Sequence, residues 1–206
     1  MKRLAIFGAS GHGKVIAEIA ELCGWTEVIF FDDDTNKNKL EKWLVSGNMN
    51  TLISKAINFD GCLVAIGDNK IRSEKIELLL SKGFNNLVSL IHPSAIVSSH
   101  CEIGVGTVIM AGSLVNPFSK IGVASIINTG SIIEHDNVIE DYVHISPGVK
   151  TSGGVKIGSK TWIGAGSSIK QNLTIGQNVI VGMGSVVIDS IPKNSIAFGV
   201  PAKIQK

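Results

Sequence analysis

Several features that mark nucleic-acid-binding, secreted or membrane proteins are scarce in this chain of 206 residues. Nineteen lysines and arginines nearly balance seventeen acidic residues, so the net charge is only +2. A nucleic acid or an anionic membrane is therefore not an expected partner. No apolar run approaches the roughly 18 residues of a membrane span, and the stretch from Leu4 to Ala9 is too short for a signal peptide. We expect a soluble, cytoplasmic protein.

Cysteines and aromatic residues are also few. Cys23, Cys62 and Cys101 lie far apart and form no CxxC pair, which argues against a disulfide framework and a thiolate zinc site. Aromatic residues make up 5% of the chain, whereas 44% of it is hydrophobic. The core must therefore be aliphatic. Together with 23 glycines, this composition is typical of tightly turning β-structure and not of a disordered chain.

An aliphatic residue recurs at every sixth position from Ile91 to Val187. Of the 17 positions in this register, 16 are Ile or Val, and only Thr151 departs. This period fits neither an α-helix nor the alternation of a simple strand. It predicts a triangular solenoid in which three short strands make one coil of about 18 residues. An ordinary β-sandwich, the alternative, would lose this register at its turns.

Two further positions of the repeat have expected roles. Small residues four positions after the aliphatic one are expected near a corner; they are Thr107, Ser113, Ser119, Ser125, Ser131, Ser167 and Ser185. Glycines that directly follow the aliphatic residue are expected to turn the chain with a positive φ. They are Gly104, Gly122, Gly158, Gly164, Gly176 and Gly182.

The first 90 residues instead alternate between strand and helix patterns, which predicts a small parallel α/β domain. Expected strands are 2–7, 27–31, 62–66 and 87–91, and expected helices are 14–23 and about 70–81. For residues 35–60 we expect a helix, a short strand and a second helix. Because Pro93 ends the first pattern, the boundary is predicted at His92-Pro93, which gives domains 1–91 and 92–206.

The segment Gly8-Ala9-Ser10-Gly11-His12-Gly13 lies between an expected strand and helix, where backbone N–H groups favour a phosphate. Its glycine order differs from the G-x-G-x-x-G of dinucleotide-binding proteins, which argues against an NAD-dependent oxidoreductase. Asp32, Asp33 and Asp34 follow about 20 residues later, where a sugar hydroxyl is commonly held. We expect a nucleotide-linked ligand here. The alternative is a tight turn followed by solvated aspartates.

His135 is the candidate catalytic residue among the five histidines. It follows an inward aliphatic residue by two positions, so its side chain is expected to point outward. Asp136 or Glu134 could accept a hydrogen bond from one ring nitrogen and make the other a better general base. His144 is expected on a different face, where it could line a cleft with His135 of a second subunit. His92 and His100 are expected at the surface or boundary, and no metal site is expected.

With these residues in view, the chain resembles the hexapeptide-repeat sugar acetyltransferases of the left-handed β-helix superfamily. It is most similar to nucleotide-sugar N-acetyltransferases and sialic-acid O-acetyltransferases. The resemblance runs through the whole chain and is carried by the order of several motifs. These are residues 8–13, Phe31-Asp32-Asp33, residues 65–72, Leu90-Ile91-His92-Pro93-Ser94-Ala95, Asn128-Thr129, residues 133–136, residues 144–148 and Gly199-Val200-Pro201-Ala202-Lys203.

The resemblance implies a small Rossmann-like α/β domain that binds a nucleotide sugar, followed by a left-handed parallel β-helix with a short C-terminal tail. It implies a homotrimer with acetyl-CoA between subunits, no metal, and His135 as the catalytic base with Asp136 as its partner. Residues implied in coenzyme binding are His144, Gly153, Ala165 and Met183. Those implied in substrate binding are Ser10, Gly11, His12, Asp32, Asp33, Gly67 and Asn69.

The implied activity is acetyl transfer from acetyl-CoA to the amine of a UDP-4-amino-sugar in bacterial glycan synthesis. O-acetylation of sialic acid or a related sugar is the alternative. Asp136 stands where similar proteins carry glutamate, so its shorter arm must reach the imidazole by a backbone shift or through water. A trimeric scaffold without catalysis and a metal-dependent hydratase are the competing classes. The first predicts that His135→Ala has no effect, and the second predicts bound zinc.

Overall fold

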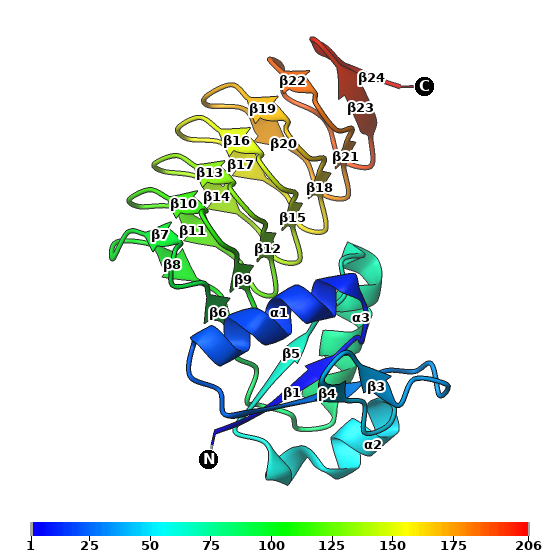
Figure 1. Cartoon of the computed structure of the whole chain (residues 1–206). Helices are drawn as coiled ribbons and strands as arrows, with labels where there is room; N and C mark the ends of the chain where they lie inside the picture. The colour runs from blue at the N-terminus through cyan, green and yellow to red at the C-terminus, as the bar shows by residue number, and fades with distance from the viewer. Residues whose placement is uncertain (1, 206) are drawn as a thin grey trace. The chain divides into compact units, whose positions relative to one another are not determined.

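The computed structural model describes residues 2–205. They form two compact units that divide between Ile91 and His92. In Figure 1 the first unit runs from blue to the first green segment, and the second continues from green to red.

A three-stranded parallel sheet forms the centre of the N-terminal unit. Its strands lie in the order β2 (Glu27–Phe31), β1 (Arg3–Phe7) and β5 (Gly61–Val64). The long helices α1 (Gly11–Leu22) and α3 (Asn69–Ser81) follow β1 and β5. All four residues of β5 and the last four of β1 are buried, as expected for parallel strands that are covered on both faces. The carboxyl ends of the three strands therefore meet at one edge.

The α/β pattern is confirmed, but four expected details are wrong. Helix α1 begins three residues before the expected Lys14, so Gly11, His12 and Gly13 form its first turn. Gly13 permits this early start, because a Cβ there would lie 2.5 Å from the Gly8 carbonyl oxygen. The strand expected to reach Ile66 ends at Val64, and the strand expected from Leu87 is reduced to β6 (Leu90–Ile91).

The fourth error is the helix expected at the start of residues 35–60. The chain there forms a small antiparallel hairpin, β3 (Lys39–Leu40) and β4 (Trp43–Leu44). It continues into α2 (Met49–Ser54), which begins where the Asn48 side chain accepts a hydrogen bond from the Thr51 N–H, and then into a 3₁₀ turn, Ala56–Asn58. Two-residue strands are too short to give a periodic pattern, which explains the error.

The C-terminal unit is a left-handed parallel β-solenoid of about six turns, as predicted (Figure 1). Its strands stack in three columns, β7–β10–β13–β16–β19–β22, β8–β11–β14–β17–β20 and β9–β12–β15–β18–β21–β23–β24. The strands are β7 (Ile96–Val97), β8 (Glu102–Ile103), β9 (Val108–Ile109), β10 (Leu114–Val115), β11 (Lys120–Ile121), β12 (Ile126–Ile127), β13 (Ile132–Ile133), β14 (Val138–Ile139), β15 (His144–Ile145), β16 (Lys150–Thr151), β17 (Lys156–Ile157), β18 (Trp162–Ile163), β19 (Ser168–Ile169), β20 (Thr174–Ile175), β21 (Ile180–Val181), β22 (Val186–Val187), β23 (Ile196–Gly199) and β24 (Ala202–Ile204).

The aliphatic residues of the repeat form the core of the solenoid. Those from Ile109 to Val187 are almost completely buried and stack on one another. Thr151 stands in this stack between Ile133 and Ile169, its partners on the neighbouring strands. Its hydroxyl oxygen has no hydrogen-bond partner, although the residue is only 1% exposed.

The small corner residues form a ladder of hydroxyl groups. The hydroxyls of six of the predicted residues, and that of Thr161 at the same place in the repeat, donate to the backbone carbonyl 15 residues later, which lies on the next coil. They are Thr107, Ser113, Ser119, Ser125, Ser131, Thr161 and Ser167. We call this set the hydroxyl ladder. It satisfies carbonyls that would otherwise be buried without a partner.

The role expected for the glycines of the repeat is wrong. Positive φ occurs three residues after the aliphatic position, at 106, 112 and every sixth residue to 184, and not directly after it. Glycines directly after the aliphatic residue are instead required by close approach between coils. A Cβ on Gly158, for example, would lie 2.4 Å from the Gln177 nitrogen.

Candidate active site

His135 and Asp136 form a hydrogen-bonded pair in the turn between β13 and β14. The Nδ1–H of His135 donates to Oδ2 of Asp136 over 2.7 Å, and both side chains are 62% exposed. Asp136 occupies a positive-φ position of the repeat, with φ of 58°, a conformation that aspartate adopts more readily than most residues. The shorter acid therefore reaches the imidazole directly.

Asp136, and not Glu134, is the carboxylate that contacts the imidazole. Glu134 Oε2 accepts a hydrogen bond from the Asn116 side chain over 2.8 Å, which turns it toward the preceding coil. With Nδ1 of His135 fixed by Asp136, Nε2 is the nitrogen that can take up a proton. An exposed imidazole held in this way can act as a general base, with a carboxylate beside it to stabilise the protonated form.

A groove of about 420 Å³ lies on the column that contains β12, β15, β18 and β21. His144 stands in it, 9% exposed and stacked on Trp162, with ring centroids 5.7 Å apart and planes 4° apart. The Asn128 side-chain amide contacts Nε2 of His144 over 3.2 Å, and the Trp162 indole N–H donates to the Ser146 hydroxyl over 2.7 Å. Ala165 and Met183 complete a mostly apolar lining.

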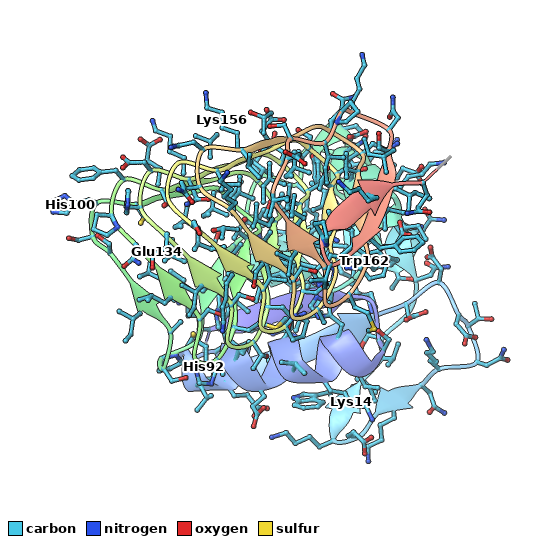
Figure 2. The ribbon with its side chains drawn as sticks, turned by 90° about the horizontal axis from the view of Figure 1, so that it is seen from above. Lys14, His92, His100, Glu134, Lys156 and Trp162 are labelled. Carbon is cyan, nitrogen blue, oxygen red and sulfur yellow. The ribbon has the colours of Figure 1, made fainter. Side chains whose placement is uncertain are left out.

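The predicted coenzyme residues are thus only partly brought together. His144, Ala165 and Met183 line the groove, whereas Gly153 lies against the imidazole ring of His135. His135 itself stands in a turn between the other two columns of strands. Figure 2 shows Glu134, the neighbour of His135, and Trp162 on separate parts of the solenoid surface.

In the N-terminal unit, four of the predicted substrate residues line one pocket of about 330 Å³. Ser10, Asp32, Asp33 and Gly67 surround it at the carboxyl ends of β1, β2 and β5. Gly11 is exposed beside this pocket in the first turn of α1, and His12 is half-buried there. Asn69 does not line the pocket. Its Oδ1 accepts a hydrogen bond of 2.6 Å from the buried guanidinium of Arg72.

The two aspartates of this pocket differ in their surroundings. Asp32 accepts hydrogen bonds from the N–H groups of Ala9 and Asp34 and pairs with Lys37. Burial alone would raise the pKa of Asp32, but these hydrogen bonds outweigh it and the pKa is lowered. Asp33 is more exposed, and its Oδ2 lies 2.5 Å from Lys75 Nζ. Asp33 and Lys75 therefore present one negative and one positive group to the pocket.

Sequence reasoning missed Lys75, Trp162, Asn128 and Ser146 as site residues. A signal for Trp162 was available, because it follows His144 by 18 residues and one coil of the predicted solenoid has that length. No comparable signal existed for Lys75, which lies 42 residues from Asp33 on another element.

The remaining histidines and cysteines have local partners. His92 Nδ1 accepts a hydrogen bond from the Ser94 N–H, and His100 stacks on Phe118. The Cys101 thiol donates to the Asn116 carbonyl, and burial raises its pKa; burial also raises the pKa of Cys62 to about 12.

Over residues 2–205, no three histidine, cysteine or acidic side chains are grouped so that they could hold a metal. No helix in that range is long and apolar enough to span a membrane.

A left-handed solenoid with an outward histidine–aspartate pair defines the class of hexapeptide-repeat transferases. Residues 154–189 match the family described as bacterial transferase hexapeptide (six repeats), and residues 3–79 match the family described as PglD N-terminal domain.

Solved structures agree over the whole chain. A histidine-to-asparagine mutant of perosamine N-acetyltransferase from Caulobacter crescentus, in complex with CoA and GDP-perosamine, is 35% identical. It superposes with a TM-score of 0.96 over 100% of this chain and 98% of that one. The acetyltransferase domain of PglB from Neisseria gonorrhoeae FA1090, in complex with acetyl coenzyme A, is 38% identical, with a TM-score of 0.95 over 99% of each chain. The chain belongs to the hexapeptide-repeat sugar N-acetyltransferases.

A curated relative is similar over a shorter stretch. UDP-N-acetylbacillosamine N-acetyltransferase from Bacillus subtilis (strain 168) is 42% identical over 114 residues, which are 54% of this chain and 52% of that protein. The alignment thus spans about half the length of this relative.

Proposed function

We propose that the protein transfers the acetyl group of acetyl-CoA to the amine of a nucleotide-linked amino sugar. The observation that carries this proposal is the 2.7 Å hydrogen bond between His135 and Asp136 on an exposed turn. It gives a base on an exposed side chain, and Asp136 engages only one of its two ring nitrogens. The similarity to enzymes solved with CoA and GDP-perosamine, or with acetyl coenzyme A, supports the choice of donor and acceptor.

In this mechanism the amine of the sugar attacks the carbonyl carbon of the thioester. His135 Nε2 removes the proton that the nitrogen loses as the C–N bond forms. Asp136 stabilises the resulting imidazolium, and the C–S bond breaks to release CoA, which takes up the proton as a thiol. General-base catalysis of this kind contributes about 10²–10⁴ to the rate. Neither cysteine with a raised pKa is needed as a nucleophile.

The groove beside His144 has the chemistry to hold acetyl-CoA. Its apolar lining by Trp162, Ala165 and Met183 suits the pantetheine arm, and the polar groups of the half-buried Asn128 and the buried His144 suit the end that bears the thioester. The groove and His135 stand on different columns of one chain. We therefore propose a homotrimer in which His135 of one subunit faces the groove of the next.

The pocket lined by Ser10, Asp32, Asp33 and Gly67 is the proposed site of the nucleotide sugar. The first turn of α1, which begins at the exposed Gly11, offers backbone N–H groups to a phosphate, and Asp33 offers a carboxylate to ribose or sugar hydroxyls. Lys75 is a third candidate contact, with a positive charge for the diphosphate.

Thiol release from acetyl-CoA tests the proposal. The acceptors are UDP-, GDP- and dTDP-linked 4-amino-sugars, together with sialic acid, so that O-acetylation is a measured alternative. We expect turnover of one amino sugar. His135→Ala should lower kcat by at least about 10² without loss of the assembly. Thiol release no faster than background hydrolysis with every acceptor would refute the proposed activity.

A further inference from the structure

Gly153 lies directly against the imidazole ring of His135. The two residues are 18 positions apart and occupy the same place on neighbouring coils, where Gly154 N–H donates to the His135 carbonyl over 3.0 Å. A Cβ on Gly153 would stand 2.6 Å from Cε1 and 2.7 Å from Nε2 of the ring. Both distances are far below van der Waals contact, so the ring in its present position excludes any side chain at 153.

The backbone itself does not require glycine at this position. Gly153 is not among the residues with positive φ. Other coils carry Ala111, Ala165 and Gln171 at the same place in the repeat. Within the described residues, the three atoms nearest to a Cβ on Gly153 would all belong to the His135 ring.

Asn137 holds the same turn from inside the solenoid. It is completely buried, and its side-chain NH₂ group lies 2.6 Å from the Glu134 carbonyl, 3.3 Å from the His135 carbonyl and 3.0 Å from the Ser152 carbonyl. It occupies a position of the hydroxyl ladder, where a serine would reach only the carbonyl 15 residues later. The amide therefore links the turn that bears His135 to the segment that precedes Gly153. Asn137 Oδ1 has no hydrogen-bond partner, which is a cost of placing an amide there.

We infer that Gly153 and Asn137 are positioning residues of the catalytic base: Gly153 supplies the space in which the His135 ring lies, and Asn137 fixes the backbone that carries it. This inference deepens the proposed function and rests on it for its catalytic consequence. Displacement of the ring by about 1 Å would weaken its contact with Asp136 and misplace Nε2, which can cost about 10² in rate.

A double-mutant cycle tests the steric contact without any assay of activity. In the wild-type background, Gly153→Ala should lower the Tm, because the new methyl group meets the ring. In the His135→Ala background, the same change should raise the Tm, because the ring is gone and alanine reduces the entropy of the unfolded chain. An equal fall of Tm in both backgrounds would overturn the inference.

NMR of the imidazole nitrogens gives a second readout. In the wild-type protein the hydrogen bond to Asp136 should hold the proton of the neutral ring on Nδ1. In Gly153→Ala and Asn137→Ser the long-range ¹H–¹⁵N pattern should change to a mixture of the two tautomers. Asn137→Ser is a conservative probe, because a serine hydroxyl can restore the ladder bond to the Ser152 carbonyl. An unchanged pattern in both variants would contradict the inference.

Kinetics separates this role from a contact with the coenzyme. Gly153→Ala and Asn137→Ser should each lower kcat by about tenfold to a hundredfold, with the KM for acetyl-CoA unchanged. Thr107→Val, which removes a ladder bond to the Gly122 carbonyl far from the turn, serves as the matched control and should leave kcat unchanged. A rise in KM at constant kcat would make Gly153 a coenzyme contact and not a positioning residue, and would overturn the inference.

The two proposals fail in different ways. If the wild-type protein acetylates no acceptor, the proposed function fails, while the thermal cycle and the NMR pattern still decide whether Gly153 and Asn137 position the ring. If the wild-type protein is active and both variants match it in kcat and tautomer, the inference alone fails.

Discussion

Replacement of Thr151 by valine is expected to stabilise the protein. The hydroxyl of Thr151 is buried in the aliphatic stack without a hydrogen-bond partner. A buried polar group without a partner costs about 1–3 kcal/mol. Valine has nearly the same shape and puts a methyl group where the hydroxyl stood, so this cost is removed and apolar contact with Ile133 and Ile169 is gained.

The expected gain is about 1–3 kcal/mol in the free energy of unfolding, and each kcal/mol raises Tm by about 2–4 °C in a protein of this size. Urea denaturation followed by circular dichroism measures it as a higher midpoint at an unchanged m-value. A midpoint equal to or below that of the wild type would refute the reasoning, because it would mean that the hydroxyl is satisfied.

Thr161→Val is the matched control and should act in the opposite direction. The Thr161 hydroxyl donates to the Gly176 carbonyl over 2.7 Å and accepts from the Val179 N–H over 3.0 Å. Valine would leave both backbone groups without this partner, and we expect a loss of about 1–3 kcal/mol. The same substitution should thus stabilise one coil and destabilise another, in accordance with the hydrogen bonds of each hydroxyl.

Three further predictions concern other parts of the molecule. Gly158→Ala should lower the free energy of unfolding by more than about 1 kcal/mol, because its Cβ would lie 2.4 Å from the Gln177 nitrogen. Retention of the wild-type urea midpoint would contradict the close packing of the coils. Asp32→Asn should reduce stability at neutral pH. Because the pKa of Asp32 is lowered in the folded state, its carboxylate adds stability at pH values above its usual pKa of about 3.9, and this stability is lost as the pH falls through the folded pKa. In urea titrations the variant should therefore lose less stability in acid than the wild type. Equal losses of stability would be inconsistent with this account. Trp162→Ala should weaken acetyl-CoA binding by about tenfold in isothermal titration, because stacking with His144 is lost, and an unchanged Kd would remove the groove from the proposed site.

The solenoid could be predicted because its main signal is a single repeated requirement. Every six-residue repeat needs one aliphatic residue inside at the same place, so the pattern does not depend on contacts remote in sequence. The role of the glycines could not be inferred in the same way. Glycine suits both a positive φ and a close approach between coils. The positive-φ position is occupied in other repeats by Phe118 and Tyr142, and these residue types do not indicate a positive φ.

The candidate site was predictable where its members are neighbours in the sequence. His135 and Asp136 are adjacent, and an outward turn brings their side chains together. The contact of Gly153 with the ring depends on the stacking of coils and becomes visible only once the solenoid is built. The ion pair of Asp33 and Lys75 joins two elements of the α/β unit whose packing no local pattern specifies.

The hairpin of β23 and β24 has a consequence for the growth of the structure. Every earlier strand of its column pairs in parallel with the next, but β24 pairs antiparallel with β23. A stack of parallel strands can in principle accept another chain at its open end and extend into a fibre. Because β24 runs in the opposite direction and carries Lys203, it is a poor template for such addition. It therefore protects this end of the column from aggregation.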